Sequence, residues 1–467
     1  MKKSLFFILH LLAIQVFAQQ HQITVKIDGN TDSTMILANY WGDKVRRTET
    51  AKAVEPGVFV FEGDKKLPGG IYMLIDQNND KLFEFVINEN QKFTLSTAPY
   101  HYTANMKVKG SKENKLFFKY LLFNESVYKA IISLNDSLNN LDPGSKKYQR
   151  LSDEKDSLQK VLENYKKDFI RKNEGTFVAK LLKAMEETPI PETVKNNPDS
   201  TMAYRYLKSH YWDNFDLKDS RLLRTPLYSK KVKNYFDRLV VLDVDSVIFE
   251  IDKIIALASP NQETVSYLVW YFTSKYQNPK YMGFDKVFVH LVDKYFSQTD
   301  IDYTTPSILE SLQKRADKLR PLLIGKEAPN LILMDTTGEY RSFLSIPDDF
   351  TILLFWDAHC GVCKAEIKKL KKVLTENNKY DVAVFAVNTN RNLEEWKKVI
   401  KERGMDHWIN VNGTRSVTPD FHEIYDIDST PVIYVLDKNK VIIAKKISAE
   451  NIIKYLDFYT AKSSAND

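Results

Sequence analysis

Cysteine is nearly absent from this sequence: the 467 residues include two, Cys360 and Cys363, which stand three positions apart. A protein that relies on disulfides for stability carries several cysteines, usually paired across long loops. A bond between residues so close in sequence restricts the unfolded chain very little. The two cysteines would therefore make a poor structural cross-link, and a chemical role explains them better.

The sequence also lacks a strong charge of one sign. Its formal net charge is +6, and lysines are interleaved with acidic residues, which is typical of solvated surfaces. Hydrophobic residues make up 43% of the chain and charged residues 27%, the composition of a globular protein. The length favours about three domains. We expect no nucleic acid among the partners.

Beyond the N-terminus, the sequence has no apolar run of about 20 residues, the length that crosses a bilayer. The N-terminus itself carries Lys2 and Lys3, then a nearly unbroken apolar run from Leu5 to Phe17, and the small residue Ala18. This is the layout of a secretory signal peptide, so residues 1–18 predict export to the periplasm or cell envelope. An uncleaved membrane anchor is the alternative. A lipid-modified N-terminal cysteine is excluded, because no cysteine lies near this segment.

Residues 19–110 have the alternating apolar pattern of β-strands, interrupted by turn signals such as Pro68-Gly69-Gly70. The strand candidates are 23–27, 58–61, 71–75 and 82–87. We predict a small antiparallel β-sandwich-like domain or a barrel. It contains no cluster of residues that would indicate catalysis.

From 111 to 320 the apolar period becomes that of helices. One long amphipathic helix is marked by three- and four-residue steps between Tyr148, Leu151, Leu158, Leu162, Tyr165 and Phe169. The segments 230–243, 262–276 and 284–297 are also helix-like. We predict a helical domain whose aromatic residues form its core, with a peptide-binding surface as the alternative. We also expect this domain to provide partner selectivity or a homodimer contact.

Residues 321–467 alternate short β runs with helical stretches, which indicates an α/β sheet with helices on both faces. We expect strands at 351–356, 382–387, 432–436 and 441–444, and helices at 360–374, 393–403 and 450–459. The last two strands form a hairpin. The predicted fold class is therefore multidomain, with an all-β N-terminal domain, an α-helical middle domain and a C-terminal α/β domain.

Cys360 and Cys363 lie where the strand at 351–356 gives way to a helix. The first thiol then lies at the helix N-terminus, where unpaired backbone N–H groups and the helix dipole stabilise the nucleophilic thiolate. The second thiol lies within one helical turn, close enough to bond to the first and to resolve a mixed disulfide with a substrate. This C-x-x-C motif predicts thiol–disulfide exchange.

Zinc and haem sites are the alternatives for such a motif. Zinc needs two more cysteine or histidine ligands at suitable spacing, and His359, His407 and His422 are scattered. Haem attachment needs a histidine directly after the second cysteine, where this chain has Lys364. We therefore predict neither a metal nor a cofactor.

The motif and its neighbours together resemble a known family. Trp356 and Glu366 flank the cysteines, Gly325-Lys326-Glu327-Ala328-Pro329 lies upstream, and Thr430-Pro431-Val432 lies downstream. Over roughly residues 321–467 this combination resembles the TlpA/ResA group of periplasmic thioredoxin-like proteins, which implies a thioredoxin fold. The preceding β and helical arrangement resembles the N-terminal regions of large thioredoxin-like proteins from Bacteroidota.

The resemblance implies roles for individual residues. Cys360 would attack a disulfide and Cys363 would resolve the product. Pro431 would be a cis-proline facing the pair, with Thr430 offering backbone hydrogen bonds to an extended substrate; an ordinary trans proline is the alternative. Trp356 would pack beside the pair at the substrate-binding side, unless it is a plain core aromatic.

Three further positions concern proton transfer and the surroundings of the first cysteine. Glu366 would relay a proton to or from Cys363, unless it is a solvated glutamate paired with Lys369. Leu354 stands where thioredoxins keep a buried aspartate, which moves acid–base duty towards Glu366. His359 replaces the usual tryptophan before the first cysteine and would lie on the substrate side.

We therefore expect a periplasmic thiol–disulfide oxidoreductase that reduces or exchanges disulfides in cell-envelope proteins. A membrane thiol donor would supply its electrons. One alternative is a peroxiredoxin-like peroxidase, which shares Gly325–Asn330 but would need a threonine where this chain has Asp357. The other is a cell-envelope binding protein in which residues 22–320 hold a ligand and the thioredoxin module is accessory.

Overall fold

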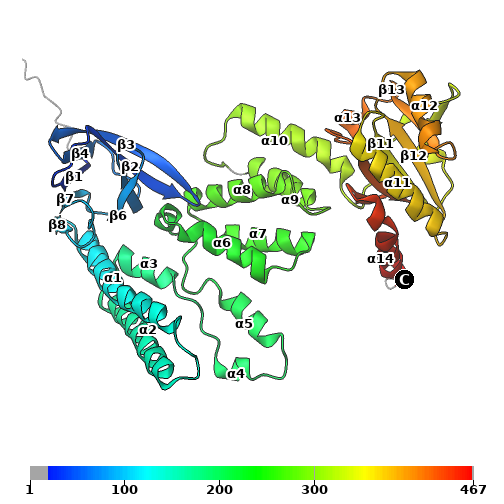
Figure 1. Ribbon diagram of the computed structural model, residues 1–467. Helices are drawn as coiled ribbons and strands as arrows, with labels where there is room; N and C mark the ends of the chain where they lie inside the picture. Colours follow the sequence, from blue (N-terminus) through cyan, green and yellow to red (C-terminus); the bar gives the residue numbers. More distant parts are fainter. Residues whose placement is uncertain (1–18, 299, 465–467) are drawn as a thin grey trace, which may run out of the picture. The chain divides into compact units, whose positions relative to one another are not determined.

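The computed structural model describes residues 19–298 and 300–464 (Figure 1). The expected signal peptide, residues 1–18, lies outside the described residues. The chain forms two compact units: one contains the described residues up to Val240 together with Leu257–Thr264, and the other contains Val241–Ala256 and the chain from Val265 onward. None of the helices in the described ranges is long and apolar enough to cross a membrane.

The first unit begins with a sheet in the strand order β6-β5-β2-β3-β4-β1-β7-β8. Its strands are β1 (His21–Ile27), β2 (Thr34–Trp41), β3 (Lys44–Glu55), β4 (Val58–Gly63), β5 (Gly70–Ile75), β6 (Lys81–Ile87), β7 (Lys92–Thr97) and β8 (Lys107–Lys109). Residues of β1 alternate between buried and more exposed, the period-two pattern of a strand with one face in a core. The expected all-β N-terminal region is confirmed.

One pair in this sheet departs from the expected antiparallel arrangement, because β1 and β7 are parallel. A parallel neighbour needs a long connection, and here the chain passes through β2 to β6 before it returns beside β1. The long strand β3 pairs with β2 over most of its length and with β4 near its end, so it joins the two halves of the sheet.

Helices follow the sheet in the first unit. They are α1 (Lys112–Leu138), α2 (Lys146–Lys172), α3 (Phe177–Ala184), α4 (Glu192–Lys195), α5 (Met202–His210), η1 (Ser220–Arg224) and α6 (Leu227–Leu239). Figure 1 shows α1 and α2 side by side as a hairpin. Tyr165 stacks on Phe123 of α1, and Phe169 packs edge-on against Tyr120. The aromatic stripe of α2 therefore packs between the two helices.

The remaining helices are α7 (Val244–Ala258), α8 (Gln262–Tyr276), α9 (Asp285–Leu291), the π-helical turn η2 (Val292–Phe296), α10 (Pro306–Leu319) and η3 (Arg320–Leu322). Thr305 caps α10 by accepting a hydrogen bond from the Ile308 amide, and Pro306 occupies its first turn. The segment expected to be a helical domain, 111–320, is thus divided between the two units.

The second unit ends in a sheet in the order β10-β9-β13-β12-β11-β14-β15. Its strands are β9 (Ile332–Asp335), β10 (Tyr340–Ser342), β11 (Phe350–Trp356), β12 (Val382–Asn388), β13 (Ile409–Ser416), β14 (Val432–Asp437) and β15 (Ile442–Lys445). β11, β12 and β13 are parallel, whereas β14 runs antiparallel to β11 and forms the expected hairpin with β15. Every residue of β11 is buried, as in a central strand covered on both faces.

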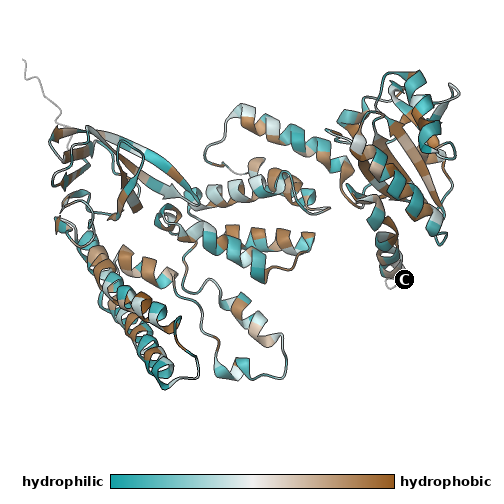
Figure 2. Cartoon of the chain, viewed as in Figure 1, coloured by the Kyte–Doolittle hydropathy of each residue, from teal (hydrophilic) through white to brown (hydrophobic). Residues whose placement is uncertain are grey.

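Helices cover both faces of this sheet, as expected, but unevenly. The long helices α11 (Gly361–Glu376), α12 (Leu393–Arg403) and α14 (Ile452–Ser464) contribute to the core that contains Ile352 and Leu354. The opposite face, with Leu353 and Phe355, is covered by α13 (Phe421–Ile424) and the short turn η4 (Phe343–Ser345). Successive right-handed crossovers in one direction place α11 and α12 on the same face. Figure 2 shows the apolar strands of this sheet in brown, beneath helices with teal outer surfaces.

Candidate functional site

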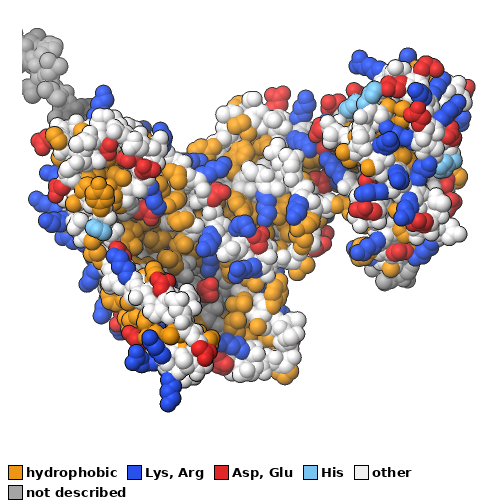
Figure 3. All heavy atoms as spheres, in the orientation of Figure 1, with side chains coloured by type: hydrophobic (Ala, Val, Ile, Leu, Met, Phe, Trp, Pro, Cys, Tyr) orange, Lys and Arg blue, Asp and Glu red, His pale blue; other side chains and the backbone are white. Residues whose placement is uncertain are grey.

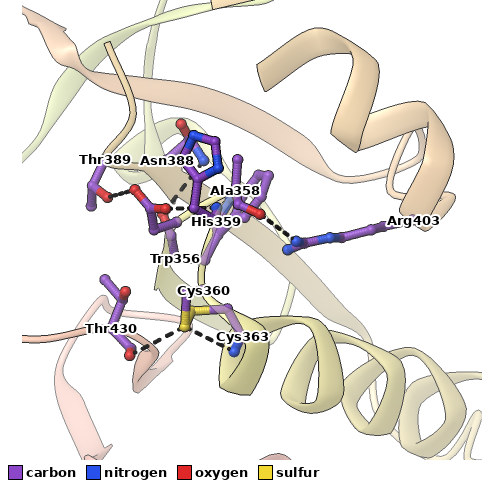
Figure 4. The surroundings of a disulfide bond; sticks show 10 residues. Trp356, Ala358, His359, Cys360, Cys363, Asn388, Thr389, Arg403 and Thr430 are labelled. Carbon is purple, nitrogen blue, oxygen red and sulfur yellow. Dashed lines mark hydrogen bonds between the residues drawn. A yellow bond between two sulfur atoms is a disulfide. The ribbon is translucent and has the colours of Figure 1, made fainter. Parts of the chain in front are cut away.

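The two cysteines lie at the carboxyl end of the central strand β11. The strand ends at Trp356, and α11 begins at Gly361 with Cys360 as its N-cap residue. Cys360 and Cys363 form a disulfide whose Cα atoms are 5.2 Å apart. The backbone N–H of Cys363 donates to Sγ of Cys360 at 3.0 Å, as Figure 4 shows. A helix N–H group is therefore aimed at the first sulfur.

The two sulfur-bearing residues differ in exposure. Cys363 is 0% exposed and belongs to the core cluster on the α11 face, whereas Cys360 is half-buried and packs at the edge of that cluster. An incoming disulfide can therefore reach Cys360 more readily than Cys363. This asymmetry suits the roles that the resemblance implies for them.

The segment directly before β14 meets Cys360. The Thr430–Pro431 peptide bond is cis, and the carbonyl oxygen of Thr430 lies 3.5 Å from Sγ of Cys360 (Figure 4). The structure thus places the expected cis-proline segment against the first cysteine. The hydrogen bonds proposed between Thr430 and a substrate stay a prediction.

Trp356 is fully buried in the same core cluster as Cys363. The guanidinium carbon of Arg403 lies 5.2 Å from its ring centroid, and Nη2 of Arg403 donates to the Ala358 carbonyl at 2.7 Å. Burial lowers the pKa of Arg403, while Asp357 and Glu402 act in the opposite direction. Trp356 is therefore a core residue behind the pair, and its burial leaves no surface for a direct substrate contact.

The loop before the first cysteine is held by Asp357. Its Oδ1 accepts from the backbone N–H of His359 at 2.7 Å, and its Oδ2 accepts from the Thr389 hydroxyl at 3.0 Å. The His359 side chain is 68% exposed, with Nε2 at 3.1 Å from a carboxylate oxygen of Glu395. His359 is thus on the surface next to Cys360, where a docked partner could touch it.

Glu366 lies one helical turn after Cys363, and its side chain is 14% exposed. Its Oε1 accepts from the backbone N–H of Ala449 at 2.5 Å, and its Oε2 lies 3.9 Å from Nζ of Lys369. The carboxylate is therefore mostly covered, unlike that of a solvated surface glutamate. It also lies near Lys369, the partner expected if Glu366 had no role in proton transfer. Proton relay by Glu366 stays a prediction.

A cavity of about 460 Å³ lies beside the pair, between the start of α11 and the cis-proline loop. We call it the groove. It is lined by Val362, Glu366, Asp426, Asp428, Ser429, Pro431, Val432, Ile433, Lys446, Ile447 and Ser448. The groove brings Glu366 and Pro431 together, although they are far apart in sequence. It also contains Asp426 and Lys446, which carried no recognisable signal in the sequence.

Comparison with family models divides the chain into three matched segments. Residues 324–445 match the AhpC/TSA family. Residues 21–117 match a domain of unknown function (DUF4369), and residues 144–317 match another (DUF5106). The AhpC/TSA match spans the sheet that carries the cysteines.

Individual proteins are also similar to parts of this chain. The chain is 23% identical over 148 residues to "Thiol-disulfide oxidoreductase ResA" of Bacillus cereus, which covers 32% of this chain and 82% of that protein. A solved "domain of possible thiol-disulfide isomerase" from Cytophaga hutchinsonii is 46% identical, with a TM-score of 0.30, 31% of this chain covered and 98% of that one. A thioredoxin-like protein from Bacteroides caccae is 18% identical, with a TM-score of 0.46 and coverage of 58% and 98%.

The family match, the ResA relatives and the sheet topology confirm the expected thioredoxin-like oxidoreductase. The C-terminal domain of this chain, residues 324–445, is therefore a thioredoxin-like domain of the AhpC/TSA family and a homologue of the ResA-type thiol–disulfide oxidoreductases.

Proposed function

We propose that this protein is an exported thiol–disulfide oxidoreductase that reduces or exchanges disulfides in proteins of the cell envelope. The observation that carries the proposal is the half-buried N-cap Cys360, bonded to the wholly buried Cys363 and receiving a helix N–H at its sulfur. This arrangement gives one accessible nucleophile and one protected resolving thiol. Such a pair needs no cofactor, because both electrons come from sulfur.

The proposed reaction has two exchange steps. In the reduced protein, the Cys360 thiolate attacks one sulfur of a partner disulfide, forming a mixed disulfide and releasing the other partner sulfur as a thiolate. Cys363 then loses its proton and attacks Sγ of Cys360, which releases the second partner thiolate and forms the Cys360–Cys363 disulfide. Two electrons pass to the partner, and the two released thiolates take up protons.

The oxidised protein must then regain two electrons. A membrane protein with a reduced dithiol would attack the Cys360–Cys363 disulfide and leave with its own cysteines oxidised. On the face shown in Figure 3, basic and acidic side chains are interspersed rather than gathered by sign. This face offers no surface of one charge to steer partners, so we expect recognition to depend on the groove beside Cys360.

Trapping in living cells tests the proposal. Full-length Cys363→Ser should accumulate mixed disulfides with envelope proteins, because the resolving thiol is gone, whereas Cys360→Ser should accumulate few. Both are read on non-reducing gels after acid quenching and alkylation. Equal trapping by the two variants would refute the assigned roles. An absence of trapped envelope proteins, together with no turnover of a protein disulfide, would favour the binding-protein alternative.

Peroxide consumption distinguishes the proposed oxidoreductase from the peroxidase alternative. Asp357 occupies the position where a peroxidatic cysteine would need a threonine, and its carboxylate is already bonded to His359 and Thr389. We therefore expect the purified protein to reduce insulin-type disulfides and to leave hydrogen peroxide almost untouched. Faster consumption of peroxide than of disulfides would overturn this expectation.

A further inference from the structure

A buried ion pair joins helix α10 to the groove. Arg315 of α10 donates from both terminal nitrogens to Asp426, with Nη2 3.0 Å from Oδ2 and Nη1 bonded to Oδ1. The Asp426 side chain is 2% exposed and that of Arg315 is 23% exposed. A two-pronged pair of this kind fixes the direction of the carboxylate as well as its charge.

Asp426 begins the segment that meets the redox pair. It lines the groove together with Pro431, and it also lines a second cavity of about 210 Å³ that is bordered by Arg315 and Lys445. Its φ of 54° is a left-handed conformation, which a residue other than glycine keeps only where its surroundings hold it. Four residues later, the Thr430 carbonyl lies 3.5 Å from Sγ of Cys360.

Charged groups from several elements face Asp426. Lys318 of α10 and Lys446 after β15 each bring Nζ to 3.6 Å from its carboxylate, and Tyr434 of β14 lines the same cavity. Burial raises the pKa of Asp426, but the hydrogen bonds and charge of Arg315, with the two lysines, hold it below its ordinary value. Without Arg315, a buried carboxylate would lose both of its directed donors.

A second buried pair connects the neighbouring helix α9 to the sheet. Nζ of Lys445 in β15 pairs with Asp285 of α9 and donates to the Leu322 carbonyl at 2.6 Å. The side chains of Lys445 and Asp285 are 7% and 8% exposed. Helices α9 and α10 are therefore each attached to the thioredoxin domain by an ion pair with at least one buried partner.

We propose that Arg315 is a positioning residue for the redox pair: through Asp426, it fixes the segment that carries Thr430 and Pro431 opposite Cys360. This inference rests on the proposed function. It gives a role to α10, the last helix that the DUF5106 match reaches, since that match extends to residue 317. The helix supports the disulfide-exchange site without touching the sulfur atoms.

Substitutions of Arg315 in the full-length chain test the inference against a matched control. Arg315→Lys keeps the positive charge but loses the two-pronged geometry. Arg315→Gln loses the charge and the geometry. Arg320→Gln is the control, because Arg320 directly follows α10 as its C-cap residue and pairs with Asp293 and Asp317 rather than with the thioredoxin sheet. Each variant is compared with wild type in thermal unfolding, in kcat/KM for a protein disulfide, and in the pH dependence of Cys360 alkylation.

We expect Arg315→Gln to reduce kcat/KM roughly 10–100-fold, the cost of a small misplacement of reacting groups. Arg315→Lys should fall between it and wild type, while Arg320→Gln should match wild type. The ratio of the Arg315→Gln rate to the wild-type rate should rise as pH falls, because protonation removes a buried Asp426 charge that Lys318 and Lys446, each at 3.6 Å, offset only in part. Arg315→Lys retains a cation, so its rate ratio to wild type should not change with pH.

The inference is overturned if Arg315→Lys and Arg315→Gln match Arg320→Gln in rate and pH profile. If Arg315→Gln fails to fold, the folded Arg315→Lys decides: a wild-type rate and alkylation profile would overturn the inference, and a reduced rate with unchanged unfolding would support it. A wild-type chain that reduces no protein disulfide refutes the proposed function itself. Active wild type with unaffected Arg315 variants refutes only the positioning role.

Discussion

At the scale of single residues, the fold gives the two cysteines different environments although they stand three positions apart. Cys360 receives an N–H from its own helix and meets the Thr430 carbonyl, while Cys363 is enclosed by the core. Leu354, in the same cluster, is 0% exposed and cannot titrate. Proton transfer at Cys363 therefore needs a group outside strand β11, and Glu366 is the carboxylate one turn away on the same helix α11.

Glu366→Gln tests whether this carboxylate moves a proton. Glutamine can still accept the hydrogen bond from the Ala449 amide through its carbonyl oxygen, so the fold should persist. A carboxylate repels a nearby thiolate and couples to its titration. We therefore expect slower exchange at mildly acidic to neutral pH, together with a changed titration of the cysteine pair. Both are measured as pH–rate curves and by alkylation.

Glu376→Gln is the control for this experiment. Glu376 lies at the end of the same helix, is 59% exposed and pairs with Lys372. Its replacement should alter neither curve, as is usual for surface substitutions. If the Glu366→Gln curves superimpose on those of wild type and of this control, Glu366 is a structural acceptor for Ala449 only. The proton would then pass through water or His359.

At the scale of elements, ion pairs join helices α9 and α10 to the thioredoxin domain. Arg315 and Asp426 are 111 residues apart in sequence, and Lys445 and Asp285 are 160 apart. Burial holds the pKa of Lys445 below its ordinary value, and Asp285 offsets this effect only in part. The sequence predicts a thioredoxin domain at 321–467 that would fold and work alone, but that segment excludes both Arg315 and Asp285.

Two fragments test how much these helices contribute. Residues 241–467 keep both buried pairs, whereas residues 321–467 leave Lys445 and Asp426 without their helical partners. Breaking a buried pair costs about 3–5 kcal/mol, so the shorter fragment should unfold at clearly lower urea concentration. Lys445→Met should restore part of its stability by removing an unpaired charge. Equal urea midpoints for the two fragments would show that the helices do not stabilise the sheet.

Local patterns predict elements well where caps and periodicity agree. Helix α12 has the bounds expected from the sequence, Leu393–Arg403, between the N-cap Asn392 and the left-handed C-cap Gly404. Strand β13 is missed because its buried Asn410 and Asn412 interrupt the apolar alternation, and their Nδ2 groups donate to backbone carbonyls that folding brings near. Asp426 and Arg403 are missed for a related reason. Their partners come from segments far away in the sequence, so no local pattern predicts these contacts.

At the scale of the whole molecule, the boundary between the two compact units falls inside the segment that matches DUF5106. The helices before Val240 lie in the same unit as the N-terminal sheet, whereas α9 and α10 are paired with the thioredoxin domain. One matched segment therefore contributes to two bodies. Partner selectivity and a homodimer contact in 111–320 stay predictions. The first unit is the better candidate for both, because the two reacting cysteines lie in the second unit.

The equilibrium reduction potential of the Cys360–Cys363 pair in the full-length protein tests the central claim, that the pair is an exchange site rather than a cross-link. It is measured by equilibrating the protein with thiol–disulfide buffers and counting free thiols by alkylation and mass spectrometry. We predict a value between about −270 and −120 mV, the range of disulfide-exchange proteins. A value below about −300 mV, typical of structural disulfides, would contradict the account.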